Sequence, residues 1–263
     1  MRARSGVVVM AVLVLLGCSD AEPADEAADP AQPTTEGAAD ETGLARCGQD
    51  VPAGAAEDVV LEPARGVALP AAVYDADAPT TLVLLHQTDR DGLCGWTPYA
   101  LEAAERGVSA VAMDTCGWGG AECPDAWDAR SSDQIQDAVD YARSKLGAQR
   151  VVLVGASLGA ARTVFAMADG VDADSWVYLS GPPSWDGRVV AEEARRIDVP
   201  GLVLHDPGDG AAEFVASAET AERAGARFVR ADGGHGYDLV FDLDGNLTRQ
   251  GEQVLEFAAG TSP

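Results

Sequence analysis

The sequence Val151-Val152-Leu153-Val154-Gly155-Ala156-Ser157-Leu158-Gly159-Ala160-Ala161 decides the fold of this chain. Four β-favouring apolar residues run into a Gly-x-Ser-x-Gly pentad, and an alanine-rich segment that favours helix follows. This order predicts a buried strand, a tight turn and a helix. A serine at such a turn has a strained backbone and crowded neighbours, and glycine at positions 155 and 159 relieves the crowding.

Ser157 is therefore a candidate nucleophile. The N-terminus of the following helix would point backbone N–H groups at an oxyanion formed there. Because the chain has 29 glycines, the pentad alone is a weak signal, and the strand and helix on either side carry the argument. The alternative is a tight turn with a surface serine that does no chemistry.

Length and charge restrict the remaining possibilities. The chain has 263 residues, of which 47% are hydrophobic, as expected for one folded domain with a tail. Its formal net charge is −25, and Lys145 is its one lysine. Nucleic acid is excluded as a partner, because its phosphates are bound by Lys and Arg.

The N-terminus has the features of an export signal. Arg2 and Arg4 precede an apolar run over residues 7–16 that is too short to span a membrane comfortably. Leu15-Leu16-Gly17-Cys18 resembles the lipobox of bacterial lipoproteins, although Leu16 is a less usual residue at its position than Ala or Ser. We expect residues 1–17 to be a signal peptide and Cys18 to be lipidated; a plain secretory signal is the alternative. The protein is then a lipoprotein of the bacterial cell envelope, in contact with the membrane through its anchor alone.

Residues 18–56 are expected to form a disordered tether. The stretch 18–45 is rich in Ala, Pro, Glu, Asp and Thr, and it has eight acidic residues and no basic one. Such a composition buries too little apolar surface to offset the entropy of the chain. The folded domain is expected to cover residues 57–263.

Four cysteines remain in the exported part: Cys47, Cys94, Cys116 and Cys123. An even number in an oxidising compartment predicts two disulfides, with three possible pairings. Cys94 and Cys116 would lie in loops after two consecutive strands, so we favour a pairing among Cys94, Cys116 and Cys123 without choosing one. Their spacing does not favour a metal site.

The rest of the chain alternates strands with helices. Because the strands are almost continuous apolar runs, they predict a mainly parallel sheet covered on both faces, an α/β fold. The predicted strands are 59–61, 67–74, 81–86, 108–113, 151–154, 175–179, 201–205 and 226–230, and the predicted helices are 96–106, 132–146, the segment after Ser157, 186–196, 211–224 and 250–259.

Several positions besides the pentad resemble the α/β-hydrolase superfamily, over residues 57 to 260. His86 ends a strand where the family has His-Gly, and the turn Asp114-Thr115-Cys116-Gly117-Trp118-Gly119 matches the family's Asp-x-x-Gly-x-Gly. A strand ending at His205 leads to Asp209, and His235 lies among three glycines after the last strand. The order Ser157, Asp209, His235 is the order of the family's triad. The segment 181–199 leaves room for a minimal lid only.

The resemblance implies that Ser157, Asp209 and His235 are catalytic. The chemistry agrees, because a serine hydroxyl needs a base and a neutral imidazole is suited to that role near pH 7. His86 and His205 fall at strand ends, where a histidine often has a structural role. Asp206 is the competitor of Asp209.

The oxyanion would be held by backbone N–H groups of Leu158 and of the loop after His86. Position favours Thr88 as the second donor, with Gln87 next. Gln87 stands where the family has glycine, and the stretch Gln87-Thr88-Asp89-Arg90-Asp91 is more charged than the entrance of a lipase would be. Both features argue against a large apolar substrate.

These features together predict an exported serine hydrolase of the carboxylesterase type, acting on a small-molecule acyl substrate without cofactor or metal. Asp242-Leu243-Asp244-Gly245-Asn246 lacks the spacing and the closing Glu of a calcium loop and is expected to be a turn. The alternatives are a non-catalytic binding lipoprotein on the same scaffold, suggested by Gln87, and an acyltransferase with the same triad.

Overall fold

The structure is a computed structural model that describes residues 43–62, 67–88, 91–123, 131–242 and 244–261. The predicted signal peptide, Cys18 and residues 18–42 of the predicted tether lie outside the described residues. Within the described ranges, no helix is long and apolar enough to cross a membrane.

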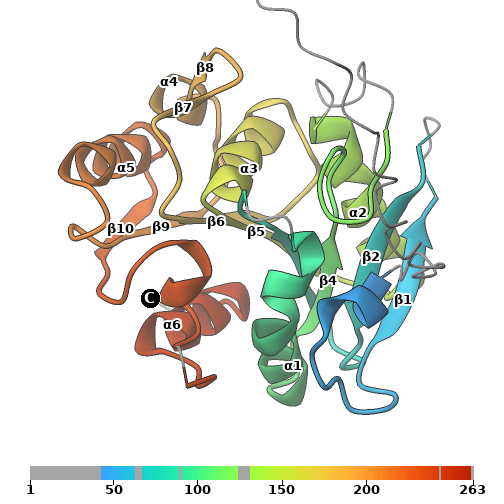
Figure 1. Cartoon of the computed structure of the whole chain (residues 1–263). Coiled ribbons are helices and arrows are strands. Elements are labelled where there is room, and N and C mark those ends of the chain that lie inside the picture. The colour runs from blue at the N-terminus through green and yellow to red at the C-terminus, as the bar shows by residue number, and fades with distance from the viewer. Residues whose placement is uncertain (1–42, 63–66, 89–90, 124–130, 243, 262–263) are drawn as a thin grey trace, which may run out of the picture. The chain divides into compact units, whose positions relative to one another are not determined.

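An eight-stranded sheet forms the centre of the domain, with strand order β1-β2-β4-β3-β5-β6-β9-β10 (Figure 1). β1 pairs antiparallel with β2 and β2 with β4, whereas all later neighbours are parallel. The strands are β1 Glu57–Leu61, β2 Leu69–Tyr74, β3 Thr80–Leu85, β4 Ser109–Met113, β5 Arg150–Ala156, β6 Ser175–Leu179, β9 Gly201–His205 and β10 Arg227–Arg230.

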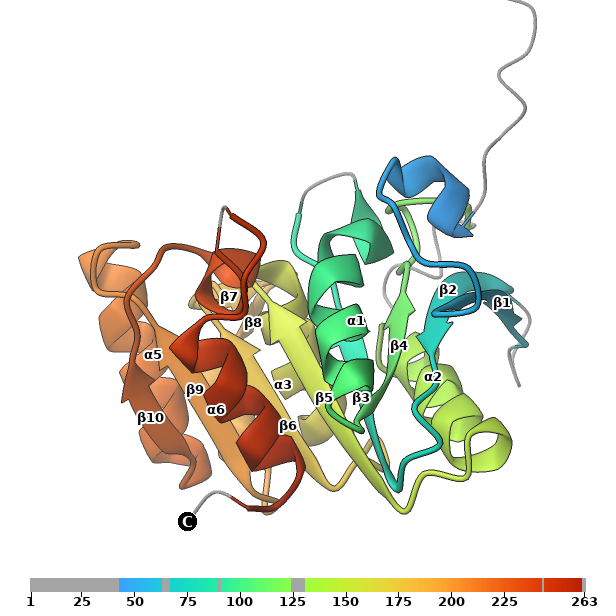
Figure 2. The same cartoon turned by 90° about the horizontal axis from the view of Figure 1, so that it is seen from below.

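Helices cover both faces of this sheet, so the predicted fold class is confirmed. Figure 2 shows α1 and α6 in front of the sheet and α2, α3 and α5 behind it. Alternate residues of the central strands face the two layers: Leu82 and Leu84 pack toward α1 and α6, and Val83 and Leu85 toward α2 and α3. The helices are α1 Thr97–Glu105, α2 Ser131–Lys145, α3 Leu158–Ala168, α4 Val190–Ala194, α5 Ala211–Ala224 and α6 Arg249–Ala258, with 3₁₀ turns η1 Gly43–Cys47, η2 Gly92–Trp96 and η4 Gly236–Leu239.

The charged helix predicted over 186–196 is wrong in its first half. Residues 184–189 form a small hairpin, β7 Ser184–Trp185 and β8 Arg188–Val189, and only α4 follows. Asp186 and Gly187 both have left-handed backbone (φ 49° and 75°), as a two-residue hairpin turn requires. The segment between β6 and β9 is therefore short and partly ordered as a hairpin.

The two disulfides are Cys47–Cys94 and Cys116–Cys123. The second lies within the favoured set, but Cys94 pairs with Cys47, which was outside it. Two disulfides indicate an oxidising, extracytoplasmic compartment.

The folded part also begins earlier than residue 57. η1 packs against β1 and β2, and the backbone N–H of Leu44 donates to Asp58 (2.7 Å). A tether that extends to residue 56 is therefore too long, because residues 43–56 belong to the folded unit.

Candidate active site

Ser157 lies on the turn from β5 into α3, as predicted. Its backbone has φ 50° and ψ −112°, a strained conformation for a residue with a side chain. The two pentad glycines have close neighbours: a Cβ at Gly155 would overlap the Gly159 carbonyl, and one at Gly159 would overlap the Leu85 carbonyl. Glycine at both positions lets β3, β5 and α3 meet beneath the serine.

The first amides of α3 point out of its N-terminus. Leu158 is the first residue of this helix, and the first N–H groups of an α-helix have no intrahelical partner. The backbone N–H of Ser157 itself donates to the Leu179 carbonyl (2.8 Å), which fixes the turn to β6. The Leu158 N–H is thus placed beside the serine with its direction set by the helix.

Asp209 and His235 come together across the loops that follow β9 and β10. His235 Nδ1 lies 2.6 Å from Asp209 Oδ2, and the His235 side chain is 45% exposed. Asp206 has a different role, since its carboxylate accepts the amides of Gly208 (2.7 Å), Gly233 and Gly234 (3.0 Å each). Asp206 therefore ties the Asp209 loop to the His235 loop.

The loop of His235 packs beside the Ser157 turn. η4 begins directly after His235 and contacts β5 and β6. A Cβ at Gly236 would lie 3.6 Å from the Ala156 side chain, the residue before the serine. Among the described residues, no hydrogen bond joins the Ser157 hydroxyl to His235, although both residues follow strands at the same edge of the sheet.

The other two histidines are buried structural residues. The His86 Nε2 accepts the Thr115 amide (3.2 Å), so its proton is on Nδ1, which donates to the Gln87 carbonyl (2.7 Å). Burial lowers the pKa of His86 to about 4, and the ring is neutral near pH 7. His205 Nδ1 lies 2.7 Å from the Ser217 hydroxyl, and burial lowers its pKa as well.

Tyr237 contacts the loop that should hold the oxyanion. The backbone N–H of Gln87 donates to the Tyr237 hydroxyl (3.1 Å), which donates in turn to the Gly92 carbonyl (3.3 Å). The Gln87 amide is thereby engaged, whereas Thr88 next to it is exposed. Sequence reasoning missed Tyr237, because its contacts join residues 150 and 145 positions apart.

Two other groups have structural roles. Trp96 is fully buried and packs against Tyr237 with ring centroids 4.9 Å apart, so it belongs to the core. The Asp242 carboxylate accepts the amides of Asp244 and Asn246, as in a self-contained turn. Across the described ranges, no three His, Cys, Asp or Glu side chains are grouped to hold a metal.

Solved structures resemble this chain at low sequence identity. An esterase from Pyrococcus furiosus, Pf2001, aligns with a TM-score of 0.62 and 13% identity over 79% of this chain and 91% of that one. Est1E from Butyrivibrio proteoclasticus aligns at 0.58 and 19% over 78% and 98%, and a dienelactone hydrolase from Anabaena variabilis at 0.61 and 13% over 78% and 98%. This chain has the α/β-hydrolase fold. A comparison with protein-family models finds no match, and neither does a sequence comparison with curated proteins.

The α/β-hydrolase fold accounts for the location of every group described above. In open α/β sheets, functional loops follow the carboxyl ends of the strands, and Ser157, Asp209, His235 and the loop after His86 all lie there. Such similarity, at less than 20% identity, establishes the scaffold, and the chemistry has to be argued from the residues.

Proposed function

We propose that this protein is an exported serine hydrolase that cleaves an ester or a related acyl bond. The observation that carries the proposal is the 2.6 Å contact of His235 with Asp209, at the sheet edge where Ser157 occupies a strained turn. The structural neighbours are consistent with it, because they include two esterases, a thioesterase domain and dienelactone hydrolases.

In the proposed reaction, the Asp209 carboxylate accepts a hydrogen bond from Nδ1–H of His235, which keeps the proton on Nδ1 and leaves Nε2 free to act as a base. Nε2 removes the hydroxyl proton of Ser157 while its oxygen forms a bond to the acyl carbon. The tetrahedral intermediate collapses as the bond to the leaving oxygen breaks, and His235 returns the proton to that oxygen. Water then hydrolyses the acyl-enzyme by the same steps and releases the acid.

The oxyanion would accept hydrogen bonds from the backbone N–H groups of Leu158 and Thr88. The Leu158 amide is fixed by the start of α3, and Thr88 is preferred to Gln87 because Tyr237 engages the Gln87 amide. Both donors are backbone N–H groups. The oxyanion hole therefore depends on how the loop after β3 is held and not on the identity of its side chains.

The short hairpin and α4 between β6 and β9 favour a small acyl substrate at an open site. We further propose that lipid on Cys18 anchors the protein to the membrane through the acidic stretch that follows it. A Cys18→Ser variant released into the soluble fraction of the envelope would support the anchor. Retention of that variant in the membrane would contradict it.

Activity is tested with p-nitrophenyl esters of increasing acyl length, on the chain from residue 18 with Cys18→Ser and both disulfides formed. The proposal predicts hydrolysis that favours short chains and that falls by several orders of magnitude in Ser157→Ala. Unchanged hydrolysis of every ester by Ser157→Ala would refute it.

A further inference from the structure

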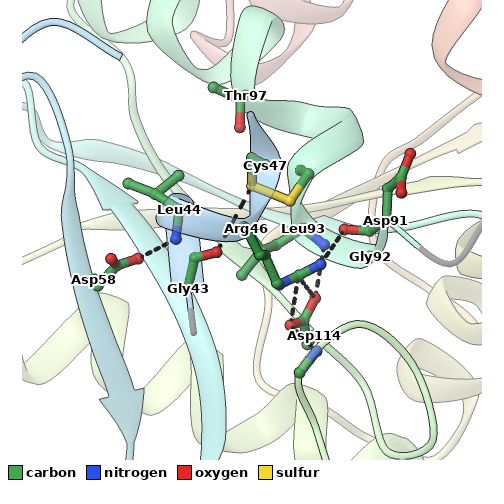
Figure 3. Close-up of a disulfide and its surroundings, with 12 residues drawn as sticks. Gly43, Leu44, Arg46, Cys47, Asp58, Asp91, Gly92, Leu93, Thr97 and Asp114 are labelled. Atoms are coloured by element: carbon green, nitrogen blue, oxygen red, sulfur yellow. Dashed lines mark hydrogen bonds and ion pairs between the residues drawn. A yellow bond between two sulfur atoms is a disulfide. The ribbon is translucent and has the colours of Figure 1, made fainter. Parts of the chain in front are cut away.

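The Asp114 carboxylate is a buried junction between four segments of the chain. It follows β4 directly and is fully buried. Both of its oxygens accept Nη2 of Arg46 (2.7 Å each), and they also accept the amides of Leu93 (2.7 Å) and Gly120 (2.8 Å). Figure 3 shows these contacts meeting beside the Cys47–Cys94 disulfide.

Residues 43–47 are attached to the segment 91–96 in three ways. The Cys47–Cys94 disulfide joins η1 to η2 covalently. Arg46 Nη1 donates to the Asp91 carbonyl (2.8 Å), and Arg46 Nη2 binds the Asp114 carboxylate, which in turn holds the Leu93 amide. The N-terminal segment is thus part of the structure that fixes this loop.

The segment 91–96 follows Thr88 in the sequence, after residues 89 and 90, which lie outside the described residues. Gly92 is in left-handed conformation (φ 55°), and a Cβ there would overlap the Asp114 carboxylate. The Gly92 carbonyl also accepts the Tyr237 hydroxyl, which holds the Gln87 amide. Tyr237 therefore holds both Gln87 and Gly92, on either side of Thr88. Arg46, Cys47 and Asp114 hold the segment that contains Gly92.

We propose that Arg46 and Cys47 are positioning residues for the oxyanion donor, so that full activity requires the Cys47–Cys94 disulfide. The assignment of Thr88 as that donor rests on the proposed function. A backbone N–H stabilises a transition state only when it is held in place beforehand, and residues 43–47 supply that hold. Formation of the disulfide needs an oxidising compartment, so the reduced chain has little activity before export and gains it afterwards.

The test compares Cys47→Ser/Cys94→Ser with the matched variant Cys116→Ser/Cys123→Ser, which also loses one disulfide. Arg46→Gln and Arg46→Lys keep both disulfides and decide the question if the first double variant does not fold. All carry Cys18→Ser. Four quantities are measured: kcat, KM, the affinity for an alkylboronic acid that matches the ester's acyl chain, and deuterium exchange of peptides covering residues 87–96.

We expect kcat of Cys47→Ser/Cys94→Ser to fall by up to about 100-fold with KM little changed, since complete removal of one oxyanion donor costs about 10²–10³ in kcat. Boronic acid affinity should fall in parallel, because only the tetrahedral form uses the hole. Exchange over 87–96 should accelerate, Arg46→Lys should retain more activity than Arg46→Gln, and Cys116→Ser/Cys123→Ser should keep its kcat.

Unchanged kcat and unchanged exchange over 87–96 in folded Arg46→Gln and Cys47→Ser/Cys94→Ser would overturn the inference. A parallel loss in Cys116→Ser/Cys123→Ser would also overturn it, because the effect would then be one of general stability. If the unmodified protein hydrolyses no ester, the proposed function fails, and the exchange over 87–96 alone decides whether residues 43–47 hold the loop.

Discussion

Asp114 and Asp206 do similar work on opposite sides of Ser157, in contrasting surroundings. Each follows the carboxyl end of a strand and collects backbone amides from neighbouring loops. Asp114 is buried with Arg46, and burial raises the pKa of its carboxyl although the Gly120 and Leu93 amides and Arg46 act in the other direction. Asp206 is close to solvent, and the amides of Gly208, Gly234 and Gly233 lower its pKa.

The contrast matches what each side has to do in the proposed reaction. The oxyanion side offers backbone N–H groups, which act only if they do not move, and it is held by a disulfide, a buried ion pair and Tyr237. The acid–base side carries His235, which would take and return a proton, and its loops are joined by the partly exposed Asp206 carboxylate and by the contact of His235 with Asp209. The oxyanion side is thus restrained more rigidly than the acid–base side.

The largest expected effect is the difference in kcat between variants of Asp209 and Asp206, the two aspartates of the acid–base side. Asp209→Asn should lower kcat about 10⁴-fold, because an amide in this position favours the wrong tautomer of His235. Asp206→Asn should lower it about fivefold, the equivalent of one hydrogen bond of about 1 kcal/mol. Steady-state kinetics on one ester measures both, and equal losses would show that Asp209 is not the partner that His235 requires.

The two disulfides should differ in their contribution to stability. Cys47–Cys94 closes a loop of 47 residues and Cys116–Cys123 one of 7, so chain entropy predicts about 4 and about 2 kcal/mol respectively. Urea unfolding of the two double-serine variants gives the free energies of unfolding. A larger loss in Cys116→Ser/Cys123→Ser would contradict the larger stabilisation expected from the longer loop that Cys47–Cys94 closes.

His86 should make the oxyanion side sensitive to mild acid. Its pKa falls from 6.5 to about 4 on folding. Between these two pH values His86 is therefore protonated in the unfolded chain and neutral in the folded chain. Stability should therefore decrease by about 3 kcal/mol as the pH falls from 6.5 to 4. The decrease should be smaller in His86→Gln; His205 titrates in the same direction in both proteins and cancels from the difference. An identical pH dependence of the two proteins would contradict a neutral, buried His86.

Asp206 should act in a more acidic range and more weakly. A carboxylate whose pKa is lowered by folding stabilises the protein above its unfolded pKa of 3.8, and this contribution disappears as the pH falls through the folded value. The difference in free energy of unfolding between the unmodified protein and Asp206→Asn should therefore shrink below pH 3.8. A difference that is constant with pH would show that the charge of Asp206 is not what joins the two loops.

The centre of the fold could be predicted from the sequence because local signals determine it, whereas the pairing of His235 with Asp209 was implied by the resemblance to the α/β-hydrolase superfamily. The strand, pentad and helix around Ser157 are contiguous, and the glycines at 155 and 159 have the tight contacts that the turn required. Asp186-Gly187 is also a local signal for a turn. The helical pattern that follows it led to the wrong prediction of a helix from residue 186.

The anchoring of the oxyanion side could not be predicted, since it depends on contacts between distant segments. Cys47 and Cys94 are 47 residues apart, and the acidic composition up to residue 45 suggested that the whole stretch before residue 57 was a tether. Arg46 is the first basic residue after eight acidic ones, and its partner Asp114 is 68 positions away. Nothing local to either residue indicates that they meet.

The most direct test of the account is the intact mass of the protein after treatment with a fluorophosphonate, with Ser157→Ala alongside. An activated serine should give a single stoichiometric adduct, and Ser157→Ala should give none. No adduct on the folded protein with both disulfides formed, or an adduct that persists in Ser157→Ala, would contradict Ser157 as the nucleophile.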